Sequence, residues 1–597
     1  MWYGFLVAAA VAPAAALILA AVYNSTPLGK KRNISNFKAL VVGVFVATIF
    51  MFIPIHGATG AELKGGALRA VILSVFNAIQ IFALGSEFSV VTDSMQYCPA
   101  DLAGDYQIIL AFIFIIAPIL TFGFVLSMFR NISAQFRYLM CFFRDVYAFS
   151  ELNEKSIALA SDLKKNNKKA VIVFTDVFEA NEERSYELAE AAKKIKAICL
   201  KKDLLAVRFQ RHSANARISV FAIGEDEEEN LNQSLNIVEQ YKNRKNTDLY
   251  VFSTRIESEL LLNAVDKGEV RVRRVNEIKS LINRLLYDSG ETIFINSTEN
   301  EDGIREVGAV VIGMGRHGTE MVKSLAWFGQ MDGYHITINS FDKDSLSEEK
   351  FMSLAPELMA PEYNGALIDG EAQYKINIHS GYDVETISFA KKIQELKNTT
   401  YVFVSLGDDN MNIQTAVNLR MLFERIGMHP VIQALVYNTQ QNKALKGIRN
   451  FRGTAYDIDF IGDMESCYTE AVIIHSELEH KALQRHLGWG TEDDFWNFEY
   501  NYRSSVASAI HLHTRIKLGM PGSDKKESEL TEEEKRIVEE IEHRRWNAYM
   551  RSEGYVYSGS KDSSSRNDLA KMHHDLVNYA ELSEEDKRKD SMVGTLS

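Results

Sequence analysis

Three glycines lie between an apolar run and a helical pattern near the middle of the chain. The apolar run, residues 309–312, is followed at once by Gly313-Met-Gly315-Arg-His-Gly318, and apolar residues then recur at helical spacing. In such a turn the first glycine permits a tight bend, the second lets the backbone approach phosphate oxygens, and the third lets the helix pack closely on the strand. The helix start adds free N–H groups and a positive dipole, so the spacing predicts a phosphate-binding turn.

Four further residues belong to this candidate site. The next predicted strand, residues 336–341, ends at Asp342, which is placed to accept hydrogen bonds from ribose hydroxyls. Arg316 and His317 lie on the turn, where each is either a phosphate contact or a solvated side chain, and Asp408 follows the predicted strand 402–406. The expected ligand is NAD(H) or another adenine nucleotide, bound by Gly313, Gly315, Arg316, His317, Gly318, Asp342 and Asp408. The alternative is that the glycines serve packing only and nothing binds.

A second set of aromatic and basic residues lies near the end of the chain. A capping box, Thr531 with Glu534, predicts the start of a helix there. Aromatic rings could form a wall for a planar base, and nearby cations could contact phosphates. The alternative is that the rings are the core of a small domain, and His543 is expected to be a structural hydrogen bonder. The candidate ligand residues are His543, Arg545, Trp546, Tyr555, Tyr557 and Lys571.

Strand and helix patterns alternate along two long segments, which predicts α/β folding with parallel sheets. In the first segment, predicted strands lie at residues 146–149, 170–174, 218–223, 249–253 and 270–275, but the turn after the first strand has no glycine. We therefore expect this copy to serve dimerisation and coupling to the membrane. The predicted organisation is two Rossmann-like doubly wound domains at 145–290 and 305–490, a connecting segment at 491–530 and a mainly helical module at 531–597.

The first part of the chain, residues 1–130, is far more apolar than the rest. Runs at 2–22, 39–55 and 108–129 are long enough to cross the hydrocarbon layer. A fourth run, 67–84, is interrupted by Arg69, Asn77 and Gln80, which are costly next to lipid. We expect it to be a partial or re-entrant helix, or an amphipathic helix at the surface. A cleaved signal peptide is disfavoured because no basic residue precedes the first run.

Charge asymmetry predicts the orientation of these segments. Basic residues lie between the first two runs and after the last one, whereas residues 86–105 carry acids and no Lys or Arg. Positive flanks favour the cytosol, so three spans with the N-terminus outside satisfy every flank. The expected location is the inner (plasma) membrane, with the α/β domains and the last module cytoplasmic.

Composition excludes several classes of function. The net charge of −13 argues against nucleic-acid binding, and the four cysteines show no spacing typical of disulfide frameworks or zinc sites. We find no nucleophile triad, metal-ligand cluster or P-loop. A membrane-anchored NAD-dependent oxidoreductase would need a proton-transfer pair near the glycine turn, and none is evident, so we expect no enzyme.

The two α/β segments resemble the paired RCK or TrkA-N domains that regulate cation channels and potassium uptake systems. The residues that carry the resemblance are 309–318, Asp342 and 401–412. It implies domains that assemble into dimers or rings, bind nucleotides or ions at the glycine turn and move attached transmembrane helices. The first copy departs from the family because it has no glycine fingerprint.

The last segment is similar to the RyR repeat, first described in ryanodine receptors. The typical residues of the repeat are matched in order and spacing by His543, Trp546, Gly554, Tyr555, Tyr557, Asp562, Lys571, His573, Leu576, Tyr579 and Leu582. His574 and Ser563 depart from the pattern. In bacterial proteins with Rossmann-like domains, the resemblance implies recognition of a nucleotide-derived messenger, often in anti-phage systems.

Together these features predict a nucleotide-sensing, ligand-gated membrane protein, either channel-like for cations or a pore-forming effector. Its expected partners are membrane lipid, a nucleotide or nucleotide-derived messenger, and further copies of itself in a dimer or tetramer. The alternative is a non-conducting, membrane-tethered sensor or scaffold.

Overall fold

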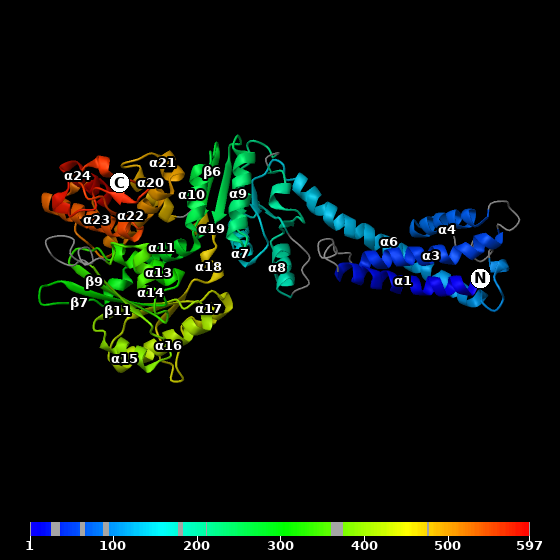
Figure 1. The fold of residues 1–597 in the computed structure, drawn as a ribbon, viewed down its shortest axis with the longest axis horizontal. Helices are drawn as coiled ribbons and strands as arrows, with labels where there is room; N and C mark the ends of the chain where they lie inside the picture. The colour runs from blue at the N-terminus through cyan, green and yellow to red at the C-terminus, as the bar shows by residue number, and fades with distance from the viewer. Residues whose placement is uncertain are drawn as a thin grey trace. The chain divides into compact units, whose positions relative to one another are not determined.

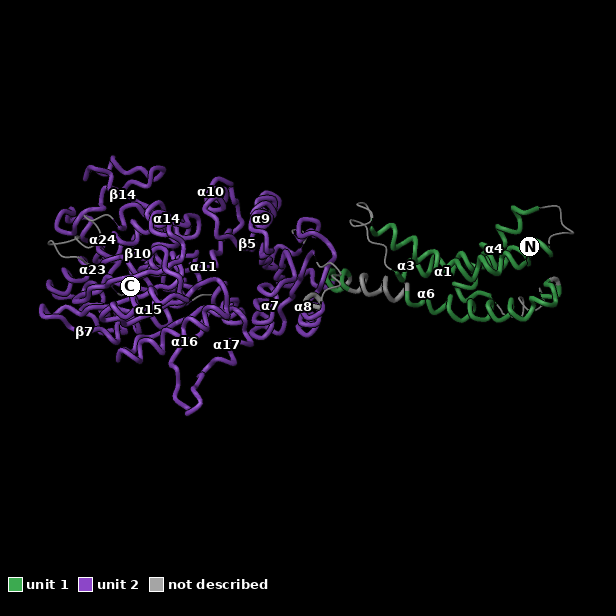
Figure 2. The backbone as a smooth tube through the Cα atoms, turned by 60° about the horizontal axis from the view of Figure 1, so that its bottom comes forward, with its two compact units in different colours: residues 1–139 green, residues 140–597 purple. Residues whose placement is uncertain are grey.

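The computed structural model describes residues 2–25, 36–59, 66–86, 95–176, 183–209, 212–359, 374–474 and 477–595. The chain divides into two compact units, residues 1–139 and 140–597 (Figure 2). Each unit has its own buried core, and each is described by itself below.

The first unit is a group of apolar helices: α1 (Trp2–Ser25), α3 (Asn36–Thr59), α4 (Gly66–Phe82) and α6 (Ala103–Leu139), with a 3-10 turn at Met95–Tyr97. Three of them are long and apolar enough to cross a membrane, at Trp2–Ser25, Asn36–Thr59 and Ala103–Gly123. Helix α6 begins before the apolar run predicted at 108–129 and continues past it. Helix α4 has 17 residues, so it is about 25 Å long, shorter than the hydrocarbon core of about 30 Å.

Helix α3 lies at the centre of this unit and contacts α1, α4 and α6. A Cβ atom at Gly43 would lie 2.7 Å from the Cα of Pro13, so the glycine permits a close approach of α1 and α3. The amide of Asn77 on α4 bonds His56 on α3 at 2.9 Å. Of the predicted polar interruption of α4, Asn77 is therefore satisfied by a neighbouring helix, whereas Arg69 is exposed together with Leu68, Ile72 and Phe76.

The second unit contains two large parallel sheets (Figure 1). The first has the strand order β3-β2-β1-β4-β5-β6. Its strands are β1 (Val146–Phe149), β2 (Val171–Phe174), β3 (Ile198–Cys199), β4 (Ile218–Ala222), β5 (Thr247–Phe252) and β6 (Val270–Val275). Its helices are α7 (Glu154–Asn166), α8 (Glu183–Lys194), α9 (Glu227–Tyr241), α10 (Ile256–Ala264) and α11 (Glu277–Ser289).

The second sheet repeats this order as β10-β9-β8-β11-β12-β13, and a short β7 (Thr298–Glu299) pairs antiparallel with β8. Its strands are β8 (Arg305–Ile312), β9 (Tyr334–Asp342), β10 (Tyr374–Ser380), β11 (Thr399–Val404), β12 (Val431–Leu435) and β13 (Ile458–Ile461). The helices are α12 (Thr292–Ile295), α13 (Arg316–Phe328), α14 (Ser347–Leu354), α15 (Ile387–Glu395), α16 (Asp409–Arg425) and α17 (Thr439–Leu445). In both sheets the order reverses beside the first strand, which creates a crevice at the strand ends.

The chain then returns to the first sheet. Helices α18 (Met464–Cys467) and α19 (Glu470–Ile473) contact α7, and Tyr468 and Ile473 are buried in the core of the first sheet. The sequence placed these residues in the second α/β domain. Their buried apolar side chains pack in the core of the first sheet and so connect the two domains, while the boundary expected at residue 490 stays a prediction.

Segment 491–530, expected as a connection, contains helices rather than a linker. After α20 (Glu477–His486) come α21 (Glu492–Asn497) and α22 (Glu499–Lys517), and the middle of α22 is buried. The capping box of Thr531 and Glu534 is present at the start of α23 (Glu532–Ser552). The remaining elements are 3-10 turns at Glu527–Glu529, Ser563–Ser565 and Tyr579–Glu581, the strand pair β14 (Val556–Tyr557) and β15 (Met572–His573), and α24 (Glu584–Gly594).

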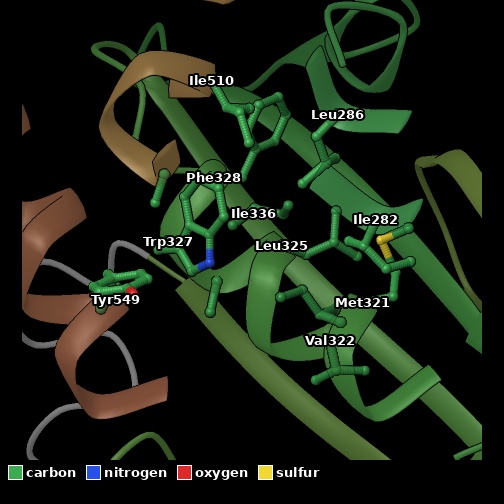
Figure 3. Close-up of a cluster of buried hydrophobic side chains, with 14 of the residues drawn as sticks. Ile282, Leu286, Met321, Val322, Leu325, Trp327, Phe328, Ile336, Ile510 and Tyr549 are labelled. Carbon is green, nitrogen blue, oxygen red and sulfur yellow. The ribbon is translucent and has the colours of Figure 1, made fainter. Parts of the chain in front are cut away.

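One hydrophobic core joins the second sheet to these last helices (Figure 3). Helix α13 packs between its sheet and the side chains of α11, α22 and α23, and Trp327 lies edge-on to Tyr549 of α23 at 6.2 Å. Arg503 of α22 adds ion pairs to Glu259 at 3.0 Å and Glu553 at 2.9 Å. The C-terminal helices are therefore part of the α/β body and not an independent appendage.

Truncation of Trp327 tests this shared core. The side chain is 4% exposed, so Trp327→Ala leaves a cavity and should lower the free energy of unfolding by about 3–5 kcal/mol. Urea unfolding followed by circular dichroism measures the change. The control Ile387→Ala alters a side chain that is 73% exposed and should change stability by less than about 0.5 kcal/mol. A cost below about 1 kcal/mol for Trp327→Ala would contradict the shared core.

Candidate functional site

The glycine turn connects β8 to α13, and packing demands two of its three glycines. Gly313 has φ +92, and a Cβ there would lie 2.5 Å from the carbonyl oxygen of Ser405 on the loop after β11. A Cβ at Gly318 would lie 1.7 Å from the carbonyl oxygen of Gly313. A side chain at Gly318 would push α13 away from the end of β8, and one at Gly313 would push the turn away from the loop after β11, so both glycines have a structural function.

Gly315 differs from its two neighbours in the motif. No atom of the described residues lies within 4 Å of a Cβ built at this position, and its φ of −64 suits any residue. Gly315 is also the N-cap of α13, and no side chain of the described part of the chain caps the helix there. The backbone N–H groups of the first turn of α13 therefore border open space, which is the arrangement that binds anions.

Asp342 holds the glycine turn in place from the end of β9. Its carboxylate accepts hydrogen bonds from the Met314 N–H at 2.5 Å and from the Asp344 N–H at 2.7 Å. Each carboxylate oxygen retains a second lone pair, so Asp342 can also accept a bond from a ligand hydroxyl. Asp408, after β11, caps α16 by accepting from the Met411 N–H at 2.9 Å. Asp342 ends β9 and Asp408 follows β11, and these two strands lie on either side of β8. Both acids therefore lie at the end of the sheet where its order reverses.

The side chain of Arg316 extends toward the first sheet, whereas that of His317 bonds a residue of its own sheet. Arg316 Nη1 lies 3.7 Å from Glu227 Oε1 and 3.3 Å from Thr254 Oγ1. His317 Nε2 shares a hydrogen bond of 2.8 Å with the Tyr437 hydroxyl, and burial lowers the pKa of His317, so the ring is neutral near pH 7. The contacts of Arg316 thus connect the glycine turn of the second sheet to the loops of the first sheet.

A cavity of about 1010 Å³ lies between the two sheets. The first sheet contributes residues that follow its strands, and the second sheet contributes residues from the ends of β8, β12 and β13. Its lining includes Lys155, Glu227, Thr254, Arg316, His317 and Tyr437. No sequence pattern indicates Glu227, Thr254 or Tyr437, because each comes from a different strand end and belongs to no local motif.

The equivalent turn of the first sheet is occupied by its own side chains. Glu151 Oε2 accepts from the Glu225 N–H at 3.1 Å, and burial raises the pKa of this carboxyl. Asn153 caps α7 in a box with Ser156. The N–H groups that an anion would need are therefore satisfied internally, which accounts for a turn without glycines.

Two of the C-terminal candidates are buried and paired. His543 donates from Nε2 to the Val577 carbonyl at 2.9 Å, and its Nδ1 lies 3.2 Å from Asp590. Arg545 is 1% exposed and pairs with Glu542 at 2.7 Å. His543 is thus a structural hydrogen bonder, as the sequence predicted. Arg545 was expected to be available to phosphates, but it points into the core.

The remaining C-terminal candidates are half-buried or fixed by neighbours. Trp546 lies edge-on to His573 at 4.9 Å, whereas Tyr555 contacts Tyr500 at 6.1 Å. The backbone N–H of Tyr557 donates to Glu357 at 3.1 Å, and Lys571 Nζ donates to the Glu553 carbonyl at 2.7 Å. These contacts are typical of a small core and bind the module to neighbouring helices.

His573, His574 and Asp575 form one group with ligand atoms within 4.8 Å of one another. The two imidazole rings are stacked at 4.7 Å with an interplanar angle of 8°. A bound metal lies near the plane of each imidazole that binds it, and two stacked planes share no such point. His573 Nδ1 also accepts from the Asp575 N–H at 3.1 Å. We assign no metal to this group.

A scan of the chain against protein-family models finds no match, and a search of curated proteins finds none either. The function proposed below therefore follows from the geometry of the described residues.

Substitutions of Gly318 and Gly315 should separate packing from binding. Gly318→Ala forces α13 from β8 and should destabilise the protein by about 1–3 kcal/mol. Gly315→Ala meets open space and should change stability by less than about 0.5 kcal/mol. Urea midpoints of the two purified variants measure the difference. Equal costs for both substitutions would contradict the assignment of Gly315 to a ligand.

Proposed function

We propose that this protein is a membrane-anchored nucleotide sensor. Its second α/β domain, of the Rossmann type, would bind NAD(H) or another adenine nucleotide in the crevice between β8 and β11. The single observation that supports this most strongly is the contrast among the three glycines. Packing accounts for Gly313 and Gly318, whereas packing does not account for Gly315, and the open space there beside the uncapped start of α13 would admit a ligand.

The proposed contacts follow from the chemistry of the crevice. Phosphate oxygens would accept from the N–H groups of the first turn of α13, where the helix dipole is positive. A ribose hydroxyl would donate to the free lone pairs of Asp342, as in other dinucleotide sites of this strand order. Asp408 would border the ligand from the adjacent strand.

The repeated strand order supports a pair of related domains with unequal roles, similar to paired RCK or TrkA-N domains. The first domain fills its own crevice with Glu151 and Asn153, so it would transmit rather than bind. Residues 140–145 alone separate the end of α6 from β1 of this domain. A conformational change in the first domain would therefore be transmitted to helix α6 through a short connection.

Arg316 provides the proposed connection between ligand and domain arrangement. In the structure its guanidinium faces Glu227 and Thr254 of the first domain across the cavity. A phosphate at the start of α13 would compete for this guanidinium, because charge-assisted bonds to phosphate are strong. Release of Glu227 would alter the contact between the domains and so couple occupancy to conformation.

The membrane part would then be a ligand-gated, cation channel-like or pore-forming assembly in the plasma membrane. Three spanning helices, the partial helix α4 and the basic flanks favour an outside N-terminus and cytoplasmic domains. A dimer or tetramer would enclose the pore. The RyR-like module would add recognition of a nucleotide-derived messenger. The family resemblance implies a use in anti-phage signalling.

One observation favours a second candidate, a non-conducting sensor or scaffold. Asn77 of α4 bonds His56 inside its own helix group and so needs no water-filled pore. A helix that only anchors the protein would tolerate apolar replacement here.

Nucleotide binding should raise the melting temperature of the detergent-purified protein. The ligands to compare are NAD, NADH, ATP, ADP-ribose and cyclic dinucleotides, read by differential scanning fluorimetry. Gly315→Asp places a carboxylate beside the proposed phosphates and should weaken binding at least tenfold, or about 1.4 kcal/mol. The control Ser353→Asp adds the same charge at an exposed position on α14 and should bind normally. A shift that survives Gly315→Asp but is lost in Trp546→Ala would move the sensor to the RyR-like module.

Ion flux distinguishes the two candidate functions. Proteoliposomes loaded with a potassium-sensitive dye should show flux only when the stabilising nucleotide is added, and Asn77→Leu should abolish it. A protein that binds the nucleotide but never conducts would leave the scaffold as the function.

A further inference from the structure

Three arginines from three different helices meet in the core of the C-terminal helices. Arg485 of α20, Arg515 of α22 and Arg545 of α23 are 7%, 0% and 1% exposed. Ser508 connects two of them, because its hydroxyl accepts from Arg485 Nε at 3.0 Å and donates to Glu542, the partner of Arg545, at 3.4 Å. Such burial of three guanidinium groups together is costly unless their charges and donors are matched.

The acceptors around this arginine cluster are few. Glu542 pairs with Arg545 at 2.7 Å. Arg485 Nη1 donates to the Thr595 carbonyl at 3.0 Å, and Arg515 Nη1 donates to the Gly594 carbonyl at 3.1 Å. Carbonyl groups satisfy donors but carry no net charge. Among the described residues Glu542 is the carboxylate paired within the cluster, and Asp590 also acts electrostatically on Arg545, so the three cations still outnumber the acids.

Several donors of the cluster remain without a hydrogen-bond partner in the part of the chain that the structure describes. They are Arg485 Nη2, Arg515 Nε, Arg515 Nη2 and Arg545 Nη1. Buried donors are almost always satisfied in native proteins. Unpartnered N–H groups on neighbouring cations are therefore donors that await an acceptor.

The cluster also keeps its positive charge at neutral pH. Burial lowers the pKa of Arg485 and of Arg515 to about 10, and Glu542 opposes this effect in both. A more distant acid, Asp332, acts on Arg515 as well. A pKa near 10 leaves both groups protonated at pH 7, so loss of protons does not remove the excess charge.

We propose that a small inorganic anion binds between Arg485, Arg515 and Arg545. Chloride and phosphate share the required chemistry, which is negative charge with several acceptor directions for charge-assisted N–H bonds. The bound anion would lower the net positive charge of the cluster and hold α20, α22 and α23 together. Because His511 of α22 also donates to the Gln330 carbonyl just after α13, the anion would stabilise the support behind the glycine turn.

The test measures thermal stability of the full-length protein as a function of anion. The protein is exchanged into gluconate buffer, and chloride or phosphate is titrated at constant ionic strength while tryptophan fluorescence reports unfolding. One of the two anions should raise the melting temperature saturably, by on the order of 2 °C or more. The anion that acts identifies the source. A melting temperature that depends on neither anion would overturn the proposal.

Arg515→Met is the matched variant, with Arg536→Met as the control because the Arg536 side chain is 65% exposed. Without the anion, Arg515→Met should be at least as stable as the parent protein, since one of three repelling charges is removed. With saturating anion it should show no shift, and Arg536→Met should respond like the parent. A retained shift in Arg515→Met would contradict the assignment, and Arg485→Met provides the same test if the first variant does not fold.

Discussion

The close approach of helix α13 to strand β8 is the contact on which the rest of the second unit depends. It exists only because position 318 carries no side chain: a Cβ at Gly318 would overlap the backbone of Gly313. The approach presents the start of α13 at the reversal of the strand order, beside Asp342. The same helix buries Trp327 and Phe328 on its other side. One packing constraint thus positions an anion-binding helix start and a hydrophobic core together.

That core determines how the remaining parts are arranged. Because α11, α22 and α23 pack on α13, the C-terminal helices move with the glycine turn and not apart from it. The first sheet joins from the opposite direction, through Arg316 with Glu227 and through α18 and α19 on α7. A ligand at the turn would therefore act on two neighbours at once, one through charge and one through packing.

Local patterns were sufficient to predict most strands, the glycine turn and the start of α23. Apolar runs, glycine spacing and the pair Thr531 and Glu534 are signals within a few residues, and the structure contains the corresponding elements. The buried helix α22 was missed because it carries His511, Arg515 and several serines in its core-facing positions. The direction of Arg545 was also wrong, since its partner Glu542 could be a solvated neighbour on any exposed helix.

Contacts between segments far apart in the chain could not be predicted from local sequence patterns, for a physical reason. The partners of Arg316 and the packing of Tyr468 on the first sheet are set by how two sheets meet, and the pair His317 and Tyr437 by how separate strand ends of one sheet come together, which no local period encodes. The most direct test of the central claim is hydrogen exchange of the full-length protein with and without ADP-ribose or NAD. The account predicts slower exchange of the backbone N–H groups at residues 314–319, whereas unchanged exchange there, with protection confined to 553–575, would contradict it.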